Sequence, residues 1–333
     1  AALFAGKAYA IFALLFGFTF YMQSNNQKKQ GKDFGYRFLW RLALLGVFAT
    51  WNAAFFPAGD VLLLFVVVGV VLFLTRSWSD RAIGVAAVVL LLQPVEWYHY
   101  IANLINPAHR LPDLKVAEMY GEVADYTKAG NWRDFLLGNV TLGQKASFLW
   151  AVNAGRFVQT AGLFLLGFFI GRKQLFMTNE KNIVFWTKVL IISAISFAPL
   201  YTLKELVMEN DPIVLHTQRT AFDMWQKLAF TLVLVASFIL LYQHKNFSKA
   251  VAGLRFYGKM SLTNYISQSI IGAFIYFPIG LNLAPYCGYT LSLSVGFLIF
   301  LLQLKFCKWW LARHKQGPLE YIWHKCTWIG TGK

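Results

Sequence analysis

The sequence predicts an all-α fold, a polytopic bundle of membrane-spanning helices. Three observations support this prediction. Apolar residues make up 57% of the 333 positions and charged residues only 14%, far more apolar side chain than the core of a soluble domain needs. The apolar residues gather in runs of about 17 to 25, the length that crosses a hydrocarbon layer of about 30 Å. Basic residues gather in the short segments between these runs, a pattern that reports orientation in a membrane.

Taken in order, the apolar runs predict about nine spans. Their approximate limits are residues 3–21, 38–56, 61–75, 83–101, 148–170, 183–201, 224–243, 261–279 and 289–312. We therefore expect four consecutive segments. They are N-terminal transmembrane helices (1–102), a small extracytoplasmic cap (103–145), C-terminal transmembrane helices (146–312) and a cytoplasmic interfacial tail (313–333).

The distribution of basic residues orients these spans. Most loop Lys and Arg residues lie in 28–37, 76–81, 172–181, 245–259 and the C-terminal tail. The positive-inside rule places those segments, and with them the C-terminus, in the cytoplasm. The formal net charge of +16 is explained by this topology, so nucleic acid is not an expected partner. Nine spans would leave the N-terminus outside, so we expect a further helix upstream of Ala1.

The C-terminal tail carries an amphipathic pattern. After Pro318, apolar residues recur at helical spacing, namely Leu319, Ile322, Trp323 and Cys326. Neighbouring basic residues such as Lys325 can meet lipid phosphates. The pattern predicts a helix that lies on the cytoplasmic leaflet, with the lipid bilayer as its partner.

Several motifs resemble those of one known family. The strongest is Gly-Lys-Met-Ser-Leu-Thr-Asn-Tyr at residues 258–265, followed by Gly-Pro-Leu-Glu-Tyr-Ile-Trp at 317–323. Gly59-Asp60 and Gly171-Arg172 add to the match. Together they resemble the YeiB-like family of bacterial inner-membrane proteins, which is grouped with the transmembrane acyltransferase superfamily. The chain departs from the family pattern at residues 49–52, where relatives often carry a histidine.

The resemblance implies a multi-pass protein of the bacterial inner (cytoplasmic) membrane, with ten spans in the family and the first absent here. It also implies an activity: transfer of an acyl group from a cytoplasmic donor, acyl-CoA, to a small-molecule or glycan acceptor in the envelope. No covalently bound cofactor is expected. Two alternatives come from the residues themselves: a transporter whose buried polar groups line a substrate route, or a non-catalytic membrane assembly subunit.

Arg156 is the sharpest candidate for substrate binding. It lies about eight to ten residues inside the fifth predicted span, near mid-bilayer at 1.5 Å per residue. A guanidinium there stays charged and needs carboxylate, phosphate or carbonyl partners. Asn153 and Thr160 share its face by helical spacing. The pattern is consistent with recognition of an anion or acyl donor by Arg156 and Asn153, or with a structural pair between Arg156 and an acid.

Glu96 and His99 are candidate catalytic residues near the outer end of the fourth span. A carboxylate at i and an imidazole at i+3 could form a general base, because the acid fixes the ring tautomer. The alternative is an aromatic anchor at the headgroups, built from residues 97–100. His216 is a second candidate base, whereas His109 is expected to be a solvated loop residue. Lys227 is expected to extend toward the interface.

A polar stripe on the eighth span completes the candidate set. Ser261, Asn264, Tyr265 and Gln268 share one helix face, which cannot look at lipid. We expect it to converge with Arg156 on a bound molecule, with Asn264, Tyr265 and Gln268 binding substrate. Hydrogen bonding to neighbouring helices is the alternative.

Asp60 and the cysteines complete the sequence-based assignments. Asp60 is expected to cap the third span, or to meet an acceptor hydroxyl as a catalytic acid. Three widely spaced cysteines give no metal-ligand pattern, so no metal site is predicted.

Overall fold

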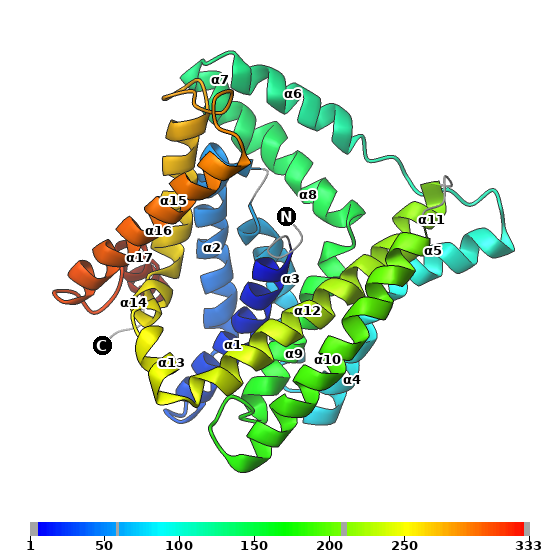
Figure 1. The fold of residues 1–333 in the computed structure, drawn as a ribbon, viewed down its shortest axis with the longest axis vertical. Coiled ribbons are helices and arrows are strands. Elements are labelled where there is room, and N and C mark those ends of the chain that lie inside the picture. Colours follow the sequence, from blue (N-terminus) through cyan, green and yellow to red (C-terminus); the bar gives the residue numbers. More distant parts are fainter. Residues whose placement is uncertain (1–5, 58–59, 208–211, 330–333) are drawn as a thin grey trace. The chain divides into compact units, whose positions relative to one another are not determined.

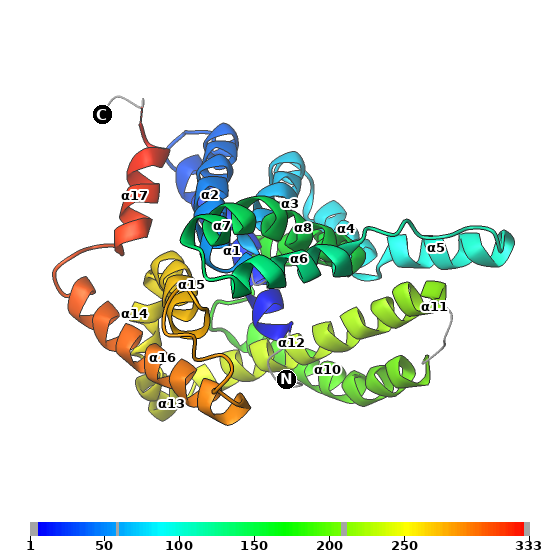
Figure 2. The ribbon, with the colours of Figure 1, turned by 90° about the horizontal axis from the view of Figure 1, so that it is seen from above.

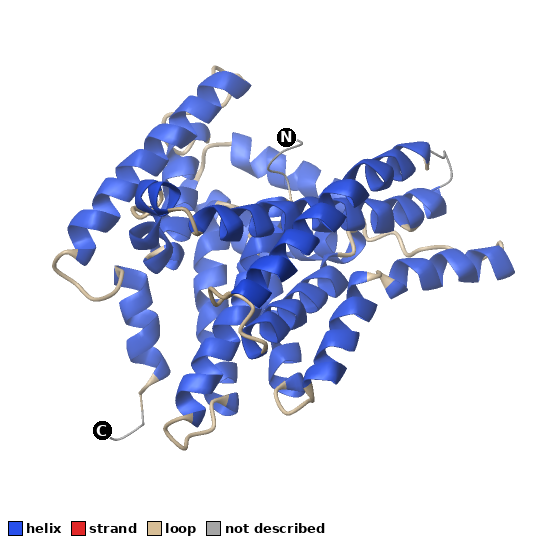
Figure 3. Ribbon diagram, turned by 60° about the horizontal axis from the view of Figure 1, so that its bottom comes forward, coloured by secondary structure: helices blue, strands red, loops and turns tan. Residues whose placement is uncertain are grey.

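The computed structural model describes residues 6–57, 60–207 and 212–329, and the regular elements among them are all helical (Figure 3). The predicted start of the first span at residue 3, and residues 58–59 of the hairpin before the third span, lie outside the described residues. The all-α prediction is therefore confirmed for the described part of the chain.

Four helical segments are long and apolar enough to cross a membrane. They are α2 (Gly35–Phe55), α10 (Glu180–Leu206), residues 213–242, which join α11 (Pro212–His216) to α12 (Gln218–Tyr242), and α16 (Tyr289–Leu311). The total rises to six among the described residues if each of two bent helix pairs counts as one span. The chain is thus a helical protein of the membrane-spanning kind.

Two helix breaks separate these bent pairs. Helices α4 (Asp80–Leu91) and α5 (Pro94–Ile105) meet at 51°, and the segment Trp132–Asn153 meets α9 (Arg156–Arg172) at 76°. Both breaks contain a left-handed residue, Gln93 (φ 58°) and Gly155 (φ 63°). Pro94 disfavours helical geometry at the residue before it, and glycine adopts positive φ without strain. The fourth and fifth predicted runs are therefore broken rather than straight.

The chain divides into two compact units. The first contains Ala1–Leu39, Leu64–Leu114 and Trp150–Phe247. In it α1 (Lys7–Lys28) packs against α9, and α10 lies beside α12 (Figures 1 and 2). Leu14, Ile170, Trp186 and Ala236 form a buried cluster that joins α1, α9, α10 and α12. Most of α3 (Leu62–Thr75) also belongs to this unit.

The crossing of α1 and α9 is built on two glycines. A Cβ atom at Gly17 would collide with the carbonyl oxygen of Phe164, and a Cβ at Gly167 would collide with that of Leu14. The two backbones therefore approach as closely as small residues allow, which is how helices associate where lipid removes the hydrophobic driving force.

The second unit contains Trp40–Leu63, Lys115–Leu149 and Ser248–Lys333. Besides most of α2 and all of α16, it contains α6 (Val116–Lys128), α7 (Trp132–Gly138), the π-helix η2 (Asn139–Gly143), most of α8 (Gln144–Asn153), the second half of α13 (Lys245–Ala250), α14 (Leu254–Lys259), α15 (Ser261–Tyr276) and α17 (Pro318–Thr327). Phe135, Ala273 and Ile279 form its buried cluster. The division into four consecutive segments stays a prediction.

The predicted tail helix is α17, and it is tied to the rest of its unit by polar contacts. The Glu320 carboxylate accepts hydrogen bonds from the backbone N–H (3.0 Å) and hydroxyl (2.6 Å) of Thr263. The Trp323 indole donates to the Arg41 carbonyl oxygen (3.2 Å), and the Arg41 guanidinium lies 4.2 Å from the Trp323 ring centroid. Tyr321 and Ile322 remain exposed, as a face that meets lipid would.

Replacing Gly17 by alanine should destabilise the protein by about 1–3 kcal/mol, because the added methyl group forces the α1–α9 backbones apart. Thermal unfolding of the detergent-purified chain, followed by tryptophan fluorescence, measures the effect. Gly272→Ala is the matched control, since a Cβ at Gly272 on α15 meets no atom within 4 Å among the described residues. Equal unfolding temperatures for the two variants would refute the proposed crossing.

Candidate functional site

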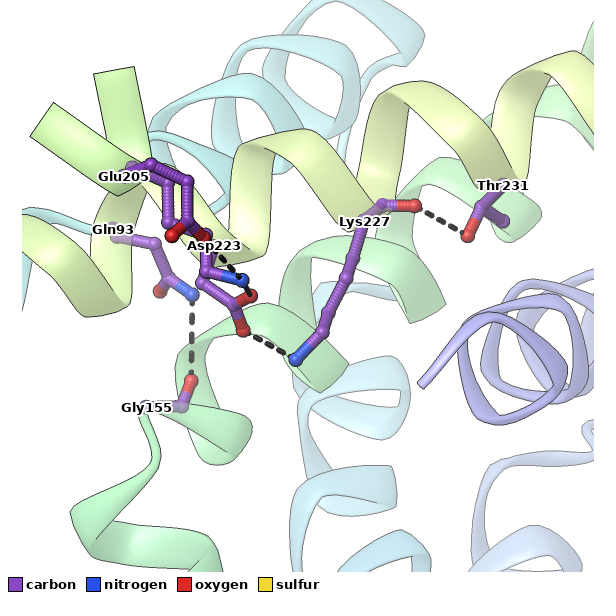
Figure 4. Close-up of polar contacts among 7 residues, drawn as sticks. Gln93, Gly155, Glu205, Asp223, Lys227 and Thr231 are labelled. Carbon is purple, nitrogen blue, oxygen red and sulfur yellow. Dashed lines mark hydrogen bonds and ion pairs between the residues drawn. The ribbon is translucent and has the colours of Figure 1, made fainter. Parts of the chain in front are cut away.

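The two helix breaks of the first unit meet each other. The Gln93 side-chain amide donates to the Gly155 carbonyl oxygen (3.5 Å), as Figure 4 shows, and the Trp225 indole donates to the Leu91 carbonyl oxygen (2.9 Å). A broken helix leaves carbonyl groups without intrahelical partners, and such groups are costly in a membrane unless the protein satisfies them. Side chains supply those partners here, so the breaks are fixed parts of the fold.

A basic cavity of about 340 Å³ lies beside the second break, and we call it the Arg156 pocket. Four cationic side chains and one carboxylate line it, namely Arg156, Lys204, Arg219, Lys227 and Asp223. Trp150, Ala154, Leu215, Thr220 and Met224 complete the lining. Cations therefore outnumber carboxylates four to one around this space.

Asp223 is shared between two of these cations. Its carboxylate lies 3.1 Å from the Lys204 ammonium and also binds that of Lys227, one helical turn along α12 (Figure 4). Lys204 has a longer contact with the neighbouring Glu205 (3.8 Å). Lys227, expected from the sequence to extend toward the interface, instead faces the pocket. One carboxylate serves two ammonium groups, so the pocket keeps an excess of positive charge.

Arg156 stands at the start of α9 and forms no ion pair within the described residues. Its guanidinium lies 4.5 Å from the ring centroid of Tyr9 and 5.5 Å from that of Trp150, and its buried Nε atom has no hydrogen-bond partner in the same part of the chain. The Tyr9 hydroxyl contacts Thr160, whose own hydroxyl donates to the Arg156 carbonyl oxygen (2.5 Å). The acid required by the structural alternative is thus not found there.

Asn153 and Arg156 do not line the same cavity. Asn153 ends α8, on the other side of the break, and is exposed. It lines a second cavity of about 610 Å³ together with His216 and residues 110–114. The shared helix face expected from the spacing is interrupted because the chain turns at Gly155. The structure does bring Asn153 and His216, a predicted base, to one space.

Glu96 and His99 do not form the predicted pair. His99 Nδ1 lies 3.0 Å from His109 Nε2, and the two rings are stacked 5.3 Å apart. Glu96 is 7% exposed and turns toward Gly155, where a Cβ atom would collide with its Oε1. Spacing on one helix could not reveal the His99–His109 contact, because His109 lies beyond the end of α5.

In the second unit the structure brings Asp60 and Tyr265 together. Asp60 Oδ1 accepts hydrogen bonds from the Leu62 N–H (3.0 Å) and the Asn52 amide (3.2 Å), so the capping role predicted for Asp60 is confirmed. The Val61 N–H donates to the Tyr265 hydroxyl (3.2 Å). Asn52 was not predicted as a site residue. A signal for it existed, because relatives of the YeiB-like family often carry a histidine where this chain has residues 49–52.

The Asp60 carboxyl is held in a polar but largely buried environment. Gln144 faces the same carboxyl, and burial raises the pKa of Asp60 to about 6. Three buried atoms here have no hydrogen-bond partner among residues 6–57, 60–207 and 212–329, namely Asn52 Oδ1, Asp60 Oδ2 and Gln144 Nε2. The cluster can hold a proton near neutral pH, which a group exchanging protons with a hydroxyl requires.

The polar stripe of α15 serves two purposes. Tyr265 and Gln268 line a mostly apolar cavity of about 590 Å³ with residues of the 277–287 segment and α16. Asn264 is buried, donates to the Tyr257 carbonyl oxygen (3.1 Å) and contacts the Cys307 sulfur of α16 (3.3 Å). Gln268 also donates to Gln303 of α16 (2.9 Å). Hydrogen bonding to neighbouring helices is thus found at Asn264 and Gln268, whereas substrate binding by the stripe stays a prediction.

The candidate residues divide between the two units. Asn153, Arg156, Glu96 and His99 lie in the first, and Asp60, Asn264, Tyr265 and Gln268 in the second. The convergence of Arg156 with Asn264 on one bound molecule stays a prediction.

The Asp60→Asn variant should lose a pH dependence of stability that the unchanged protein has. The pKa of Asp60 is about 6 in the folded state and near 3.9 in the unfolded chain. The protonated carboxyl therefore stabilises the folded state most below about pH 4, and this contribution is lost as the pH rises through 6. At pH 7 the asparagine variant should be the more stable, by at most about 3 kcal/mol. Unfolding temperatures between pH 4 and 8 measure this. Asp125→Asn, at an exposed position of α6, should leave the profile unchanged; parallel profiles for Asp60→Asn and the unchanged protein would refute the assignment.

Comparison with known proteins relates this chain to uncharacterised ones. Residues 170–330 match the family described as "Protein of unknown function (DUF418)". The chain is 21% identical over 347 residues to "Uncharacterized protein YxaH" of Bacillus subtilis (strain 168). That alignment covers 97% of this chain and 79% of the relative. It is 37% identical over 91 residues to "Uncharacterized 39.9 kDa protein in amylase 3'region" of Bacillus acidopullulyticus, which covers 27% of this chain and 25% of that protein. No solved structure matches the chain. The similarity found is therefore to proteins of unknown function, and the resemblance to the YeiB-like family stays a prediction.

Proposed function

We propose that this chain is a multi-pass membrane acyltransferase that binds an anionic substrate in the Arg156 pocket. The observation that carries the proposal is the charge of that pocket: four cationic side chains face one carboxylate around about 340 Å³. The acyl-transfer part of the proposal comes from the resemblance to the YeiB-like family.

The pocket has the chemistry of an anion site. An arginine presents a planar set of donors that matches phosphate or carboxylate, and lysines add point charges. Arg156 also stands at the N-terminus of α9, where the helix dipole favours negative charge. Tyr9 and Trp150 hold the guanidinium by its faces. Its edge is thereby left to a ligand.

We further propose nine spans with the C-terminus in the cytoplasm of a bacterial inner membrane. The apolar runs and the positive-inside rule support this topology. Lys204, at the end of α10, and Arg219, at the start of α12, would then lie at the extracytoplasmic end of the bundle. An anion held there belongs to an acceptor in the envelope, a small molecule or a glycan. Acyl-CoA would approach from the cytoplasmic side.

The proposed transfer joins the acceptor oxygen to the thioester carbonyl carbon and breaks the carbon–sulfur bond. A base takes the acceptor's hydroxyl proton, and the departing thiolate takes up a proton. We propose His99 with His109, or Asp60 beside Tyr265, for the proton steps.

Transport is the second candidate function, and the two helix breaks favour it. Discontinuous helices whose ends face a substrate are typical of secondary transporters, and the breaks at Gln93 and Gly155 meet beside the Arg156 pocket. A transporter would use the pocket to carry the anion rather than to acylate it.

Binding of glycerol 3-phosphate, a simple phosphate monoester, tests the pocket. Purified chain should bind it saturably, and Arg156→Ala should raise the Kd about 10- to 100-fold, because one charge-assisted contact is lost. Arg156→Lys, which keeps the charge but not the planar donors, should fall between. Arg255→Ala, at an exposed position in the second unit, is the matched control and should bind normally. Equal affinity of Arg156→Ala and the control would refute the anion site.

Acyl-CoA then separates the two functions. An acyltransferase should bind acyl-CoA and release free thiol when acceptor is added, whereas a transporter should instead accumulate labelled glycerol 3-phosphate in proteoliposomes. Anion uptake without thiol release would overturn the acyltransferase proposal and leave the pocket intact.

A further inference from the structure

Glu96 is a buried carboxylate without a cationic partner. It is 7% exposed, and it forms no ion pair and has no hydrogen bond to Oε2 within the described residues. Arg156 follows the break at Gly155, but its guanidinium lies over Tyr9 and Trp150. A buried charge without compensation costs several kcal/mol. A bound cation would offset that cost.

A second oxygen without a partner lies at the same junction. Gln93 is fully buried, and its Oε1 receives no hydrogen bond from residues 6–57, 60–207 or 212–329. The Gln93 amide nitrogen donates to the Gly155 carbonyl oxygen, and Glu96 Oε1 also lies against Gly155. Two side chains from α5 and the turn before it therefore converge on one residue of the other break. Both atoms are acceptors, so a cation or a hydrogen-bond donor would satisfy them.

We propose that Glu96 and Gln93 form, with backbone carbonyl oxygens of the two helix breaks, a binding site for Na⁺. Carboxylate, amide and backbone oxygens are the ligands that hard cations prefer. One carboxylate balances one positive charge, so a divalent ion would leave an excess charge in apolar surroundings. Unwound segments at the ends of broken helices coordinate Na⁺ in membrane proteins generally. The site does not depend on the identity of the anion or on acyl transfer.

Direct binding of ²²Na⁺ to the purified full chain at pH 8 tests the proposal. The unchanged protein should show saturable binding of one ion per chain. Glu96→Gln, of nearly the same shape but neutral, should reduce it to background. Glu96→Asp, which keeps the charge on a shorter arm, should weaken it about tenfold or more. Glu122→Gln removes an exposed carboxylate of α6 and should bind normally.

Displacement of ²²Na⁺ by unlabelled salts identifies the ion. It uses the unchanged protein, so it remains informative if a variant fails to fold. Unlabelled NaCl should displace the label from the unchanged protein, and choline chloride at the same ionic strength should not. Displacement by equimolar KCl would overturn selectivity for Na⁺. Absence of saturable binding at pH 8, or equal binding by folded Glu96→Gln, would overturn the site; the carboxyl would then hold only a proton. Glycerol 3-phosphate binding in the same preparations reports on the Arg156 pocket separately.

Discussion

A peptide group inside a bilayer must find its hydrogen-bond partner within the protein, and the first unit depends on how this constraint is met at Gln93 and Gly155. Both residues interrupt helices that would otherwise satisfy their own backbone. The two breaks lie against each other. The Gln93 amide donates a hydrogen bond to the Gly155 carbonyl oxygen, and the Trp225 indole donates one to the Leu91 carbonyl oxygen. The functional candidates of this unit are positioned by that junction.

The junction separates charges that would otherwise neutralise each other. Arg156 leaves it toward Tyr9 and Trp150, whereas Glu96 turns back against Gly155. An Arg156–Glu96 pair would have been an inert structural contact. Held apart, the guanidinium lines a basic pocket and the carboxylate is open to the Na⁺ ion that we propose. The same turn of backbone thus carries both the anion site and the cation site that we propose, an arrangement suited to coupling between two ligands.

The second unit uses polar residues differently. Asp60 caps α3 with one oxygen, while burial raises its pKa to about 6. Along α15, Asn264 bonds to α16 and α14, and Tyr265 and Gln268 reach a mostly apolar cavity. Within two turns of α15, polar side chains therefore both bond to neighbouring helices and line a cavity.

The helical membrane class and the approximate limits of α2, α3, α15 and α16 were predictable from the sequence, because run length and hydropathy are local properties. Pro94 and Gly155 also carried local signals for the two breaks. The packed fold was needed to show that the breaks meet, that His99 contacts His109, and that Lys227 and Lys204 share Asp223. Helical spacing defines which residues share a face, but the partner of that face depends on packing between segments distant in the chain. Such packing has no local signature.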